Sequence, residues 1–185
     1  MVKLILCITA FGLVHLLPAI PLLKTKAVGL LGKAYGPIYG VLSLALLAVA
    51  IWAFRQTTPT SLYDVPAWGR YANFGFSLLG FVCVGIFLFR GSWRNVLRYP
   101  MGLGVVLWAT GHLLANGDVA TTVLFGGLAL FAALHIVLKW LVGPFIATDV
   151  RPGHNLLSVI AGIAVYGIMT QLHYAIAGVG LVQLS

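Results

Sequence analysis

Charge is scarce in this chain. Of its 185 residues, 8% are charged and 61% are hydrophobic, and acidic residues number only three. A soluble domain carries about 25% charged residues, so lipid rather than water has to solvate most of this protein's surface. Together with a mean hydropathy of +1.06, the composition excludes a water-soluble globular protein, and the length allows a single domain.

Other absences narrow the chemistry. The two cysteines, Cys7 and Cys83, lie in apolar runs, and no Cys-x-x-Cys-His motif is present, which excludes covalently attached c-type haem. The three acidic residues, Asp64, Asp118 and Asp149, all fall between the apolar runs. Proton-coupled transporters and di-iron enzymes generally need carboxylates within the membrane, so both classes are disfavoured.

Long charge-free runs are the main feature that is present. A helix needs about 20 apolar residues to cross a bilayer, and six runs approach this length. The first run is not followed by a small-x-small cleavage site, so we expect a retained helix rather than a signal peptide. The sequence therefore predicts an all-α, polytopic membrane helix bundle of about six transmembrane helices, one domain over 1–185, with spans near 4–23, 36–54, 71–89, 101–115, 119–139 and 155–177.

The net charge of +8 suggests topology rather than nucleic-acid binding. The basic residues lie in short connections, where they contact anionic lipid and set orientation, so we expect membrane lipid as a partner and no nucleic acid. The bias puts both termini outside the cytoplasm. One side of the bundle holds Lys24, Lys26, Lys33, Arg90, Arg94, Arg98, Lys139 and Arg151, and the other holds Lys3, Arg55 and Arg70.

Histidines are the ionisable groups that fall inside the predicted spans. They are His15, His112, His135 and His173, whereas His154 lies in a loop. An ionisable group within a membrane is a functional candidate by default. At 1.5 Å per helical residue, His15 lies roughly 18 Å beyond Lys3, and His112 roughly 21 Å beyond Arg98. Both are therefore expected near mid-membrane, with His135 nearer the inner face and His173 nearer the outer face.

Two histidines at similar depth can hold a haem iron from opposite sides. We therefore predict metal ligation by His15 and His112. Gly12, one turn before His15, would leave room for a porphyrin edge, and Trp108 would pack against the ring. Two alternatives remain open: each histidine hydrogen-bonds between helices, or a zinc ion is bound, although zinc favours three or four protein ligands.

Several motifs resemble the NnrU-domain family of integral membrane proteins. They include Phe11 to Pro18, Pro66 to Arg70, the stretch Leu97 to Met101 and the string His-Leu-Leu-Ala-Asn-Gly from His112 to Gly117. The resemblance covers nearly the whole chain. The family is associated with nitrite and nitric oxide reduction in denitrifying bacteria and is related to zeta-carotene isomerase, a membrane enzyme that binds haem b.

The resemblance implies a haem b protein of the bacterial inner membrane, with both termini periplasmic. The isomerase's iron ligands fall on His15 and His112 by position, and Arg98 is a candidate partner for haem propionates. We expect a redox-linked, isomerase-like enzyme acting on a hydrophobic polyene in isoprenoid metabolism, or one associated with nitrogen-oxide respiration. The alternatives are a bis-histidine electron carrier serving quinone and a haem-free accessory protein of a respiratory complex. The sequence assigns no oligomeric state and no role to His135, His154 or His173.

Overall fold

The structure is a computed structural model that describes residues 1–142 and 145–181. In this part of the chain the regular structure is helical apart from one isolated β-bridge between Ser61 and Asp118, which confirms the predicted all-α class. The helices are α1 (Val2–Leu16), α2 (Pro21–Leu31), α3 (Tyr35–Arg55), α4 (Gly69–Leu88), α5 (Ser92–Leu97), α6 (Pro100–Ala115), α7 (Val119–Val142) and α8 (His154–Ala177), with 3-10 turns η1 (Leu17–Ala19) and η2 (Gly32–Ala34).

Within the described residues, five helical stretches are long and apolar enough to cross a membrane. They are α1 continued by η1, α2 continued by α3, α4, α7 and α8. Helix α6 is equally apolar but has only 16 residues, or about 24 Å, against a hydrocarbon thickness of about 30 Å. The chain is therefore a membrane protein, and one of its central helices is shorter than a full span.

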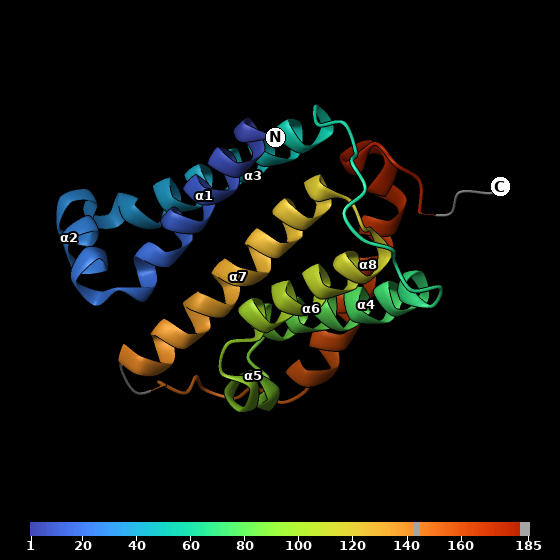
Figure 1. The fold of residues 1–185 in the computed structure, drawn as a ribbon. Coiled ribbons are helices and arrows are strands. Elements are labelled where there is room, and N and C mark those ends of the chain that lie inside the picture. Colours follow the sequence, from blue (N-terminus) through green and yellow to red (C-terminus); the bar gives the residue numbers. More distant parts are fainter. Residues whose placement is uncertain (143–144, 182–185) are drawn as a thin grey trace.

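The first predicted span, 4–23, is interrupted in the structure. Helix α1 ends at Leu16, Pro18 lies in the 3-10 turn, and Pro21 begins α2. Proline fixes φ and has no N–H to donate, so it cannot continue an α-helix but suits a first helical turn. Helix α2, none of whose residues is buried, then leads to α3 at one end of the bundle (Figure 1).

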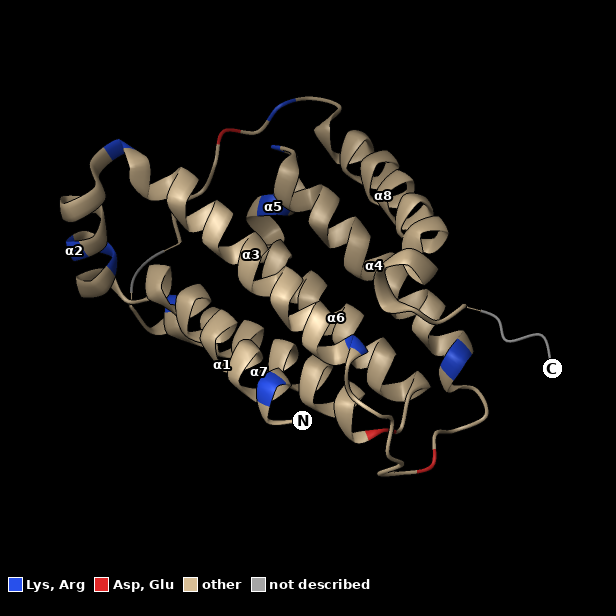
Figure 2. Cartoon of the chain, turned by 90° about the horizontal axis from the view of Figure 1, so that it is seen from above, with Lys and Arg blue, Asp and Glu red and all other residues tan. Residues whose placement is uncertain are grey.

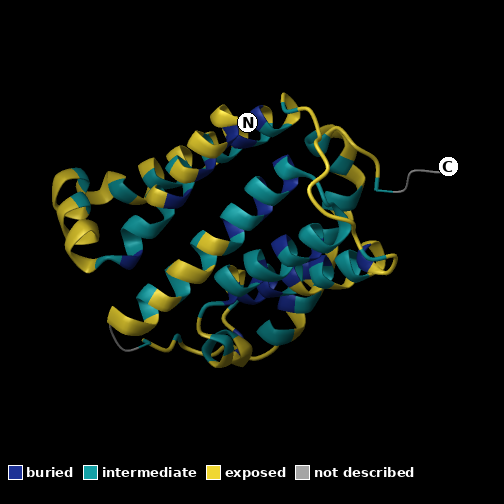
Figure 3. Ribbon diagram, in the orientation of Figure 1, coloured by how far each residue is buried: buried dark blue, intermediate teal, exposed yellow. Residues whose placement is uncertain are grey.

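The helices form an arc around a central space. Packing proceeds from α3 to α1, α7, α6, α4 and α8, while α3 and α8, the two ends of the arc, touch only lightly (Figure 1). Figure 3 shows buried residues concentrated on the inward sides of α4, α6 and α7. Basic residues lie near the ends of the long helices, on the short helices α2 and α5, and in connections (Figure 2), as expected for a bundle whose outer surface faces lipid.

Glycine allows the closest helix contact, between α4 and α6. A Cβ on Gly80 would lie 2.8 Å from the carbonyl oxygen of Gly104, and a Cβ on Gly104 would lie 2.7 Å from that of Gly80. A larger residue cannot occupy either position without moving backbone, and small residues at such crossings are typical of membrane helices. This contact fixes α6 against α4 and thereby positions the side chains at the end of α6.

Candidate functional site

His112 lies three residues before the end of α6 and is packed among aromatic rings. It stacks on Phe125 of α7 with ring centroids 4.1 Å apart, and Trp108 meets it edge-on at 5.0 Å. Its Nδ1 lies 2.9 Å from the carbonyl oxygen of Trp108. A carbonyl can only accept, so Nδ1 carries the proton and Nε2 keeps a free lone pair. The imidazole is thus held in the form that binds metals.

His173 near the end of α8 is held in a matching way by the chain that follows it. Its Nδ1 lies 2.9 Å from the carbonyl oxygen of Val179, which again places the proton on Nδ1. The contact depends on Gly178, whose φ of 78° turns the backbone back over the end of the helix. Only glycine adopts this left-handed conformation without steric cost.

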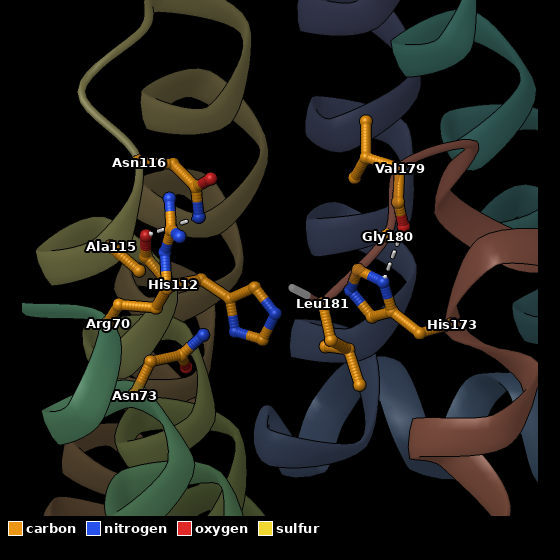
Figure 4. A pocket seen from close by; sticks show the side chains of 9 residues that line it. All are labelled: Arg70, Asn73, His112, Ala115, Asn116, His173, Val179, Gly180 and Leu181. Atoms are coloured by element: carbon orange, nitrogen blue, oxygen red, sulfur yellow. Dashed lines mark hydrogen bonds between the residues drawn. The ribbon is translucent and has the colours of Figure 1, made fainter. Parts of the chain in front are cut away.

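The two imidazoles face each other. Their ring centroids are 6.5 Å apart and their planes differ by 21°, and Figure 4 shows the edges that carry Nε2 turned toward one another across the pocket. Two metal–imidazole bonds in line span about 4 Å, and the distance from each centroid to its nitrogen makes up the rest. The separation therefore fits one metal ion between two histidine ligands.

A pocket surrounds the pair on the inside of the helix arc. Its main chamber, of about 310 Å³, is mostly apolar and is lined from α3, α4, α6, α7 and α8. Ligand pockets commonly have about 300–1,000 Å³. Besides His112 and His173, the wall includes Phe74, Trp108, Phe125, Leu128, Tyr166 and Met169. Such a wall suits a hydrophobic ligand.

The chamber continues into a more polar mouth of about 200 Å³ at the ends of the helices (Figure 4). Arg70, Asn73 and Asn116 contribute polar side chains to it. Arg70 is fixed at this level because the neighbouring Gly69 packs directly on the carbonyl group of Leu114. Sequence reasoning counted Arg70 only as a topology residue, although it belongs to one of the motifs that carried the family resemblance.

His15 lies elsewhere. Its ring stacks on Phe11 at 3.9 Å and approaches Tyr39 at 5.7 Å, and its Nδ1 donates to the Phe11 carbonyl oxygen. His135 of α7 donates from Nδ1 to the carbonyl oxygen of His15 over 2.9 Å. His112 packs on Phe125 of α7, whereas His15 contacts His135 of the same helix. These two positions are ten residues apart, so about 15 Å of helix separates the levels of His112 and His15.

The expectation that His15 and His112 share a depth is therefore wrong in this structure, and the two are not brought together. The physical reason is helix length. Helix α1 has 15 residues and α6 has 16, so 12 to 14 steps along either one lead to its far end rather than to its middle. That His15 binds a metal stays a prediction, without a partner in this packing.

The other predicted site residues divide between the two regions. Trp108 lines the pocket as expected, but Gly12 faces the ring of Phe131, which fills the space that a porphyrin edge would need. Arg98 precedes α6 with a φ of 59° and lies over Phe145. It therefore stands at the opposite end of α6 from His112 and cannot meet a ligand held there.

His154 has a structural contact. Its Nδ1 accepts the backbone N–H of Arg90 over 3.1 Å, at the start of α8. Among the residues that the structure describes, no group of three or more His, Cys, Asp or Glu side chains could hold a metal. A zinc site of the usual kind is thus not formed in residues 1–142 and 145–181, whereas His112 and His173 do face each other as a pair.

Comparison with known proteins gives the family. No curated protein and no solved structure matches the chain. The model of the family described as "NnrU protein" matches residues 3–181, which is nearly the whole chain and includes every residue that lines the pocket. The chain belongs to the NnrU family.

Proposed function

We propose that this protein is a membrane haem b protein whose iron is held between Nε2 of His112 and Nε2 of His173. The observation that carries the proposal is the facing pair of imidazoles, 6.5 Å apart at their centroids, at the wall of an apolar pocket. Haem iron is commonly held by histidine, and both rings are fixed by hydrogen bonds from Nδ1 to carbonyl groups, as ligating histidines usually are.

The residues present suit the cofactor. The chamber supplies hydrophobic walls, the edge of Trp108 and the ring of Phe125 hold His112 in place, and two ligands satisfy a haem iron, whereas zinc would require more. When bound, haem supplies one-electron redox chemistry. The protein's own contribution is to orient the two imidazoles and to exclude water from the iron.

Two activities are compatible with this site. His112 and His173 would both hold the iron, which favours a bis-histidine electron carrier that exchanges electrons with quinone or a nitrogen-oxide reductase. The chamber of about 310 Å³ favours the isomerase-like alternative, in which a hydrophobic polyene binds beside the haem.

We place the protein in the bacterial inner membrane with both termini periplasmic, because the eight-to-three bias of basic residues follows the positive-inside rule. The pocket mouth then faces the periplasm.

An absorption spectrum of the purified protein tests the proposal. Protein from haem-replete cells should show a Soret band typical of a six-coordinate, low-spin haem, and His112→Ala and His173→Ala should each abolish or strongly shift it. His135→Ala is the matched control, since that histidine also lies within a helix and bonds to a carbonyl group.

The outcomes separate the competing assignments. Retention of the wild-type spectrum in both His112→Ala and His173→Ala would reject the site. Loss of the spectrum in His15→Ala would restore the pairing of His15 with His112. A colourless, folded wild-type protein would favour the haem-free accessory role instead. Binding of carbon monoxide to the reduced protein would favour the isomerase-like alternative over the electron carrier, because it requires an axial position to open.

A further inference from the structure

The pocket is unequal in polarity along its length. The main chamber is lined largely by aliphatic and aromatic side chains, whereas the mouth is lined by Arg70, Asn73 and Asn116 together with the two histidines and Val179–Leu181. The chain has 11 basic residues, but Arg70 is the one that lines this pocket among the residues described. A ligand that fills both parts therefore needs a hydrophobic body and a polar end.

An acidic polar end would complement the basic mouth of the pocket. No described lining residue is acidic, and the nearby carboxylate of Asp118 is engaged by the backbone N–H and hydroxyl of Thr121. Arg70 is exposed and lines the mouth, whose described lining residues include no carboxylate. Guanidinium groups pair with carboxylates through two parallel hydrogen bonds, more specifically than an ammonium group does.

Asn73 provides a second donor on the same side. Its Oδ1 accepts the hydroxyl of Ser77 over 3.0 Å, which leaves its NH2 group to donate. Asn116 is oriented differently, because its NH2 group already donates to the carbonyl oxygen of His112 over 3.0 Å. Figure 4 shows Arg70, Asn73 and Asn116 together on the side of His112, with Val179 to Leu181 opposite them.

We infer that Arg70, assisted by Asn73, is the anchor for a carboxylate of the bound ligand, and that this carboxylate is a porphyrin propionate pointing out of the mouth. The inference rests on the proposed haem function and deepens it. Arg70 thereby takes the role of propionate partner that the sequence suggested for Arg98, which lies at the other end of α6. Orientation follows from it: the apolar edge of the macrocycle enters the chamber and the propionates remain at the outer face.

Binding of three tetrapyrroles to the full chain in detergent tests the inference: haem b, iron-free protoporphyrin IX, and protoporphyrin dimethyl ester, whose carboxylates are blocked. Wild type should bind protoporphyrin IX more tightly than its ester. Arg70→Gln should lower the affinity for protoporphyrin IX about tenfold, as expected for a charged hydrogen-bonded pair, and leave the affinity for the ester unchanged. Arg98→Gln is the matched control and should alter neither affinity.

The three ligands distinguish failure of the anchor from failure of the iron site. Equal weakening of acid and ester by Arg70→Gln, or an equal effect of Arg98→Gln, would overturn the anchor. Suppose that the double variant His112→Ala, His173→Ala binds haem b as tightly as wild type, while Arg70→Gln still lowers the affinity for protoporphyrin IX but not for its ester. The ligation proposal then fails and the anchor stands. If wild type binds none of the three, both proposals fall.

Competition by oleate, a carboxylate without a ring system, would show that the mouth recognises a fatty acid instead of a propionate and would also overturn the inference.

Discussion

The bundle contains two regions in which a histidine of one helix meets a histidine of another, and they are built differently. At the end of the bundle that carries the pocket mouth, called the outer region, His112 and His173 present Nε2 to each other across a pocket (Figure 4). At the opposite end, called the inner region, His135 donates to the backbone carbonyl of His15, and the ring of His15 packs on Phe11. His112 and His173 direct their Nε2 lone pairs into a shared pocket. His135 instead uses its ring N–H to join α7 to α1.

The difference shows that a histidine within a membrane helix is not by itself a ligand. Both regions satisfy Nδ1 with a carbonyl group, as a membrane interior requires of a buried donor. The outer region adds a pocket on the Nε2 side. Substitutions that change stability in both regions, but cofactor binding in only one, would test this distinction.

The largest effect is expected from Phe125→Ala. The ring of Phe125 is 8% exposed and stacks on His112 while meeting Trp108 edge-on at 4.9 Å. Its removal should lower the free energy of unfolding by about 3 kcal/mol and weaken haem binding as His112 loses its support. Thermal unfolding in detergent and haem titration measure the two quantities.

Phe11→Ala is the matched variant in the inner region, since Phe11 stacks on His15. It should reduce stability but leave haem affinity at the wild-type value. Equal loss of haem affinity in both variants would mean that the two regions are not functionally distinct.

Gly104→Val should have the next largest effect and lower the free energy of unfolding by about 2 kcal/mol. The added side chain would press on the carbonyl oxygen of Gly80 and separate α6 from α4, which should displace His112 and reduce haem binding. Gly75→Val is its control, because nothing lies within 4 Å of a Cβ at that position. Thermal unfolding of the two variants side by side checks the expectation, which an equally large loss in Gly75→Val would contradict.

A smaller effect is expected from Gly178→Ala. The φ of 78° should cost an alanine about 1 kcal/mol, and a shifted turn should release His173 from the Val179 carbonyl group and change the haem spectrum. Gly153, with a φ of 77° at the other end of α8, is the control. Gly153→Ala should cost similar stability, yet its haem spectrum should match that of wild type.

The smallest effect is expected from His135→Ala. Interhelical hydrogen bonds in membrane proteins contribute about 0.6 kcal/mol on average, so a slight decrease in the thermal midpoint is expected from losing the bond to His15. A decrease as large as that of Phe125→Ala, or any loss of haem, would give the inner histidines a role beyond packing.

The helices could be predicted from the sequence where an apolar run is long enough to cross a bilayer. The predicted 36–54 and 155–177 compare with Tyr35–Arg55 and His154–Ala177 in the structure, because lipid enforces helical structure over an apolar run. The break before Pro21 and the short helix α5 were missed. The first depends on where the two prolines fall within the run, and the second has too few residues to produce a periodic pattern.

The site could be predicted only in part. His112 and Trp108 were identifiable because an intramembrane histidine is conspicuous in so apolar a chain, but the sequence did not indicate that His173 faces His112. Choosing between His15 and His173 requires the lengths of α1 and α6 to within a turn, which composition does not provide. The position of Arg70 depends on the contact between Gly69 and Leu114, a long-range packing event with no local signal.

The light contact between α3 and α8 has a consequence for biogenesis. Because these helices close the arc without extensive packing, their separation would disturb the least packing in the arc while α4 and α6 remain together. With haem as the proposed ligand, insertion and folding in the bilayer would not wait for the cofactor, which would enter sideways from the lipid afterwards. Apo and loaded protein would then share one topology, and the order of assembly would be chain first and pigment second.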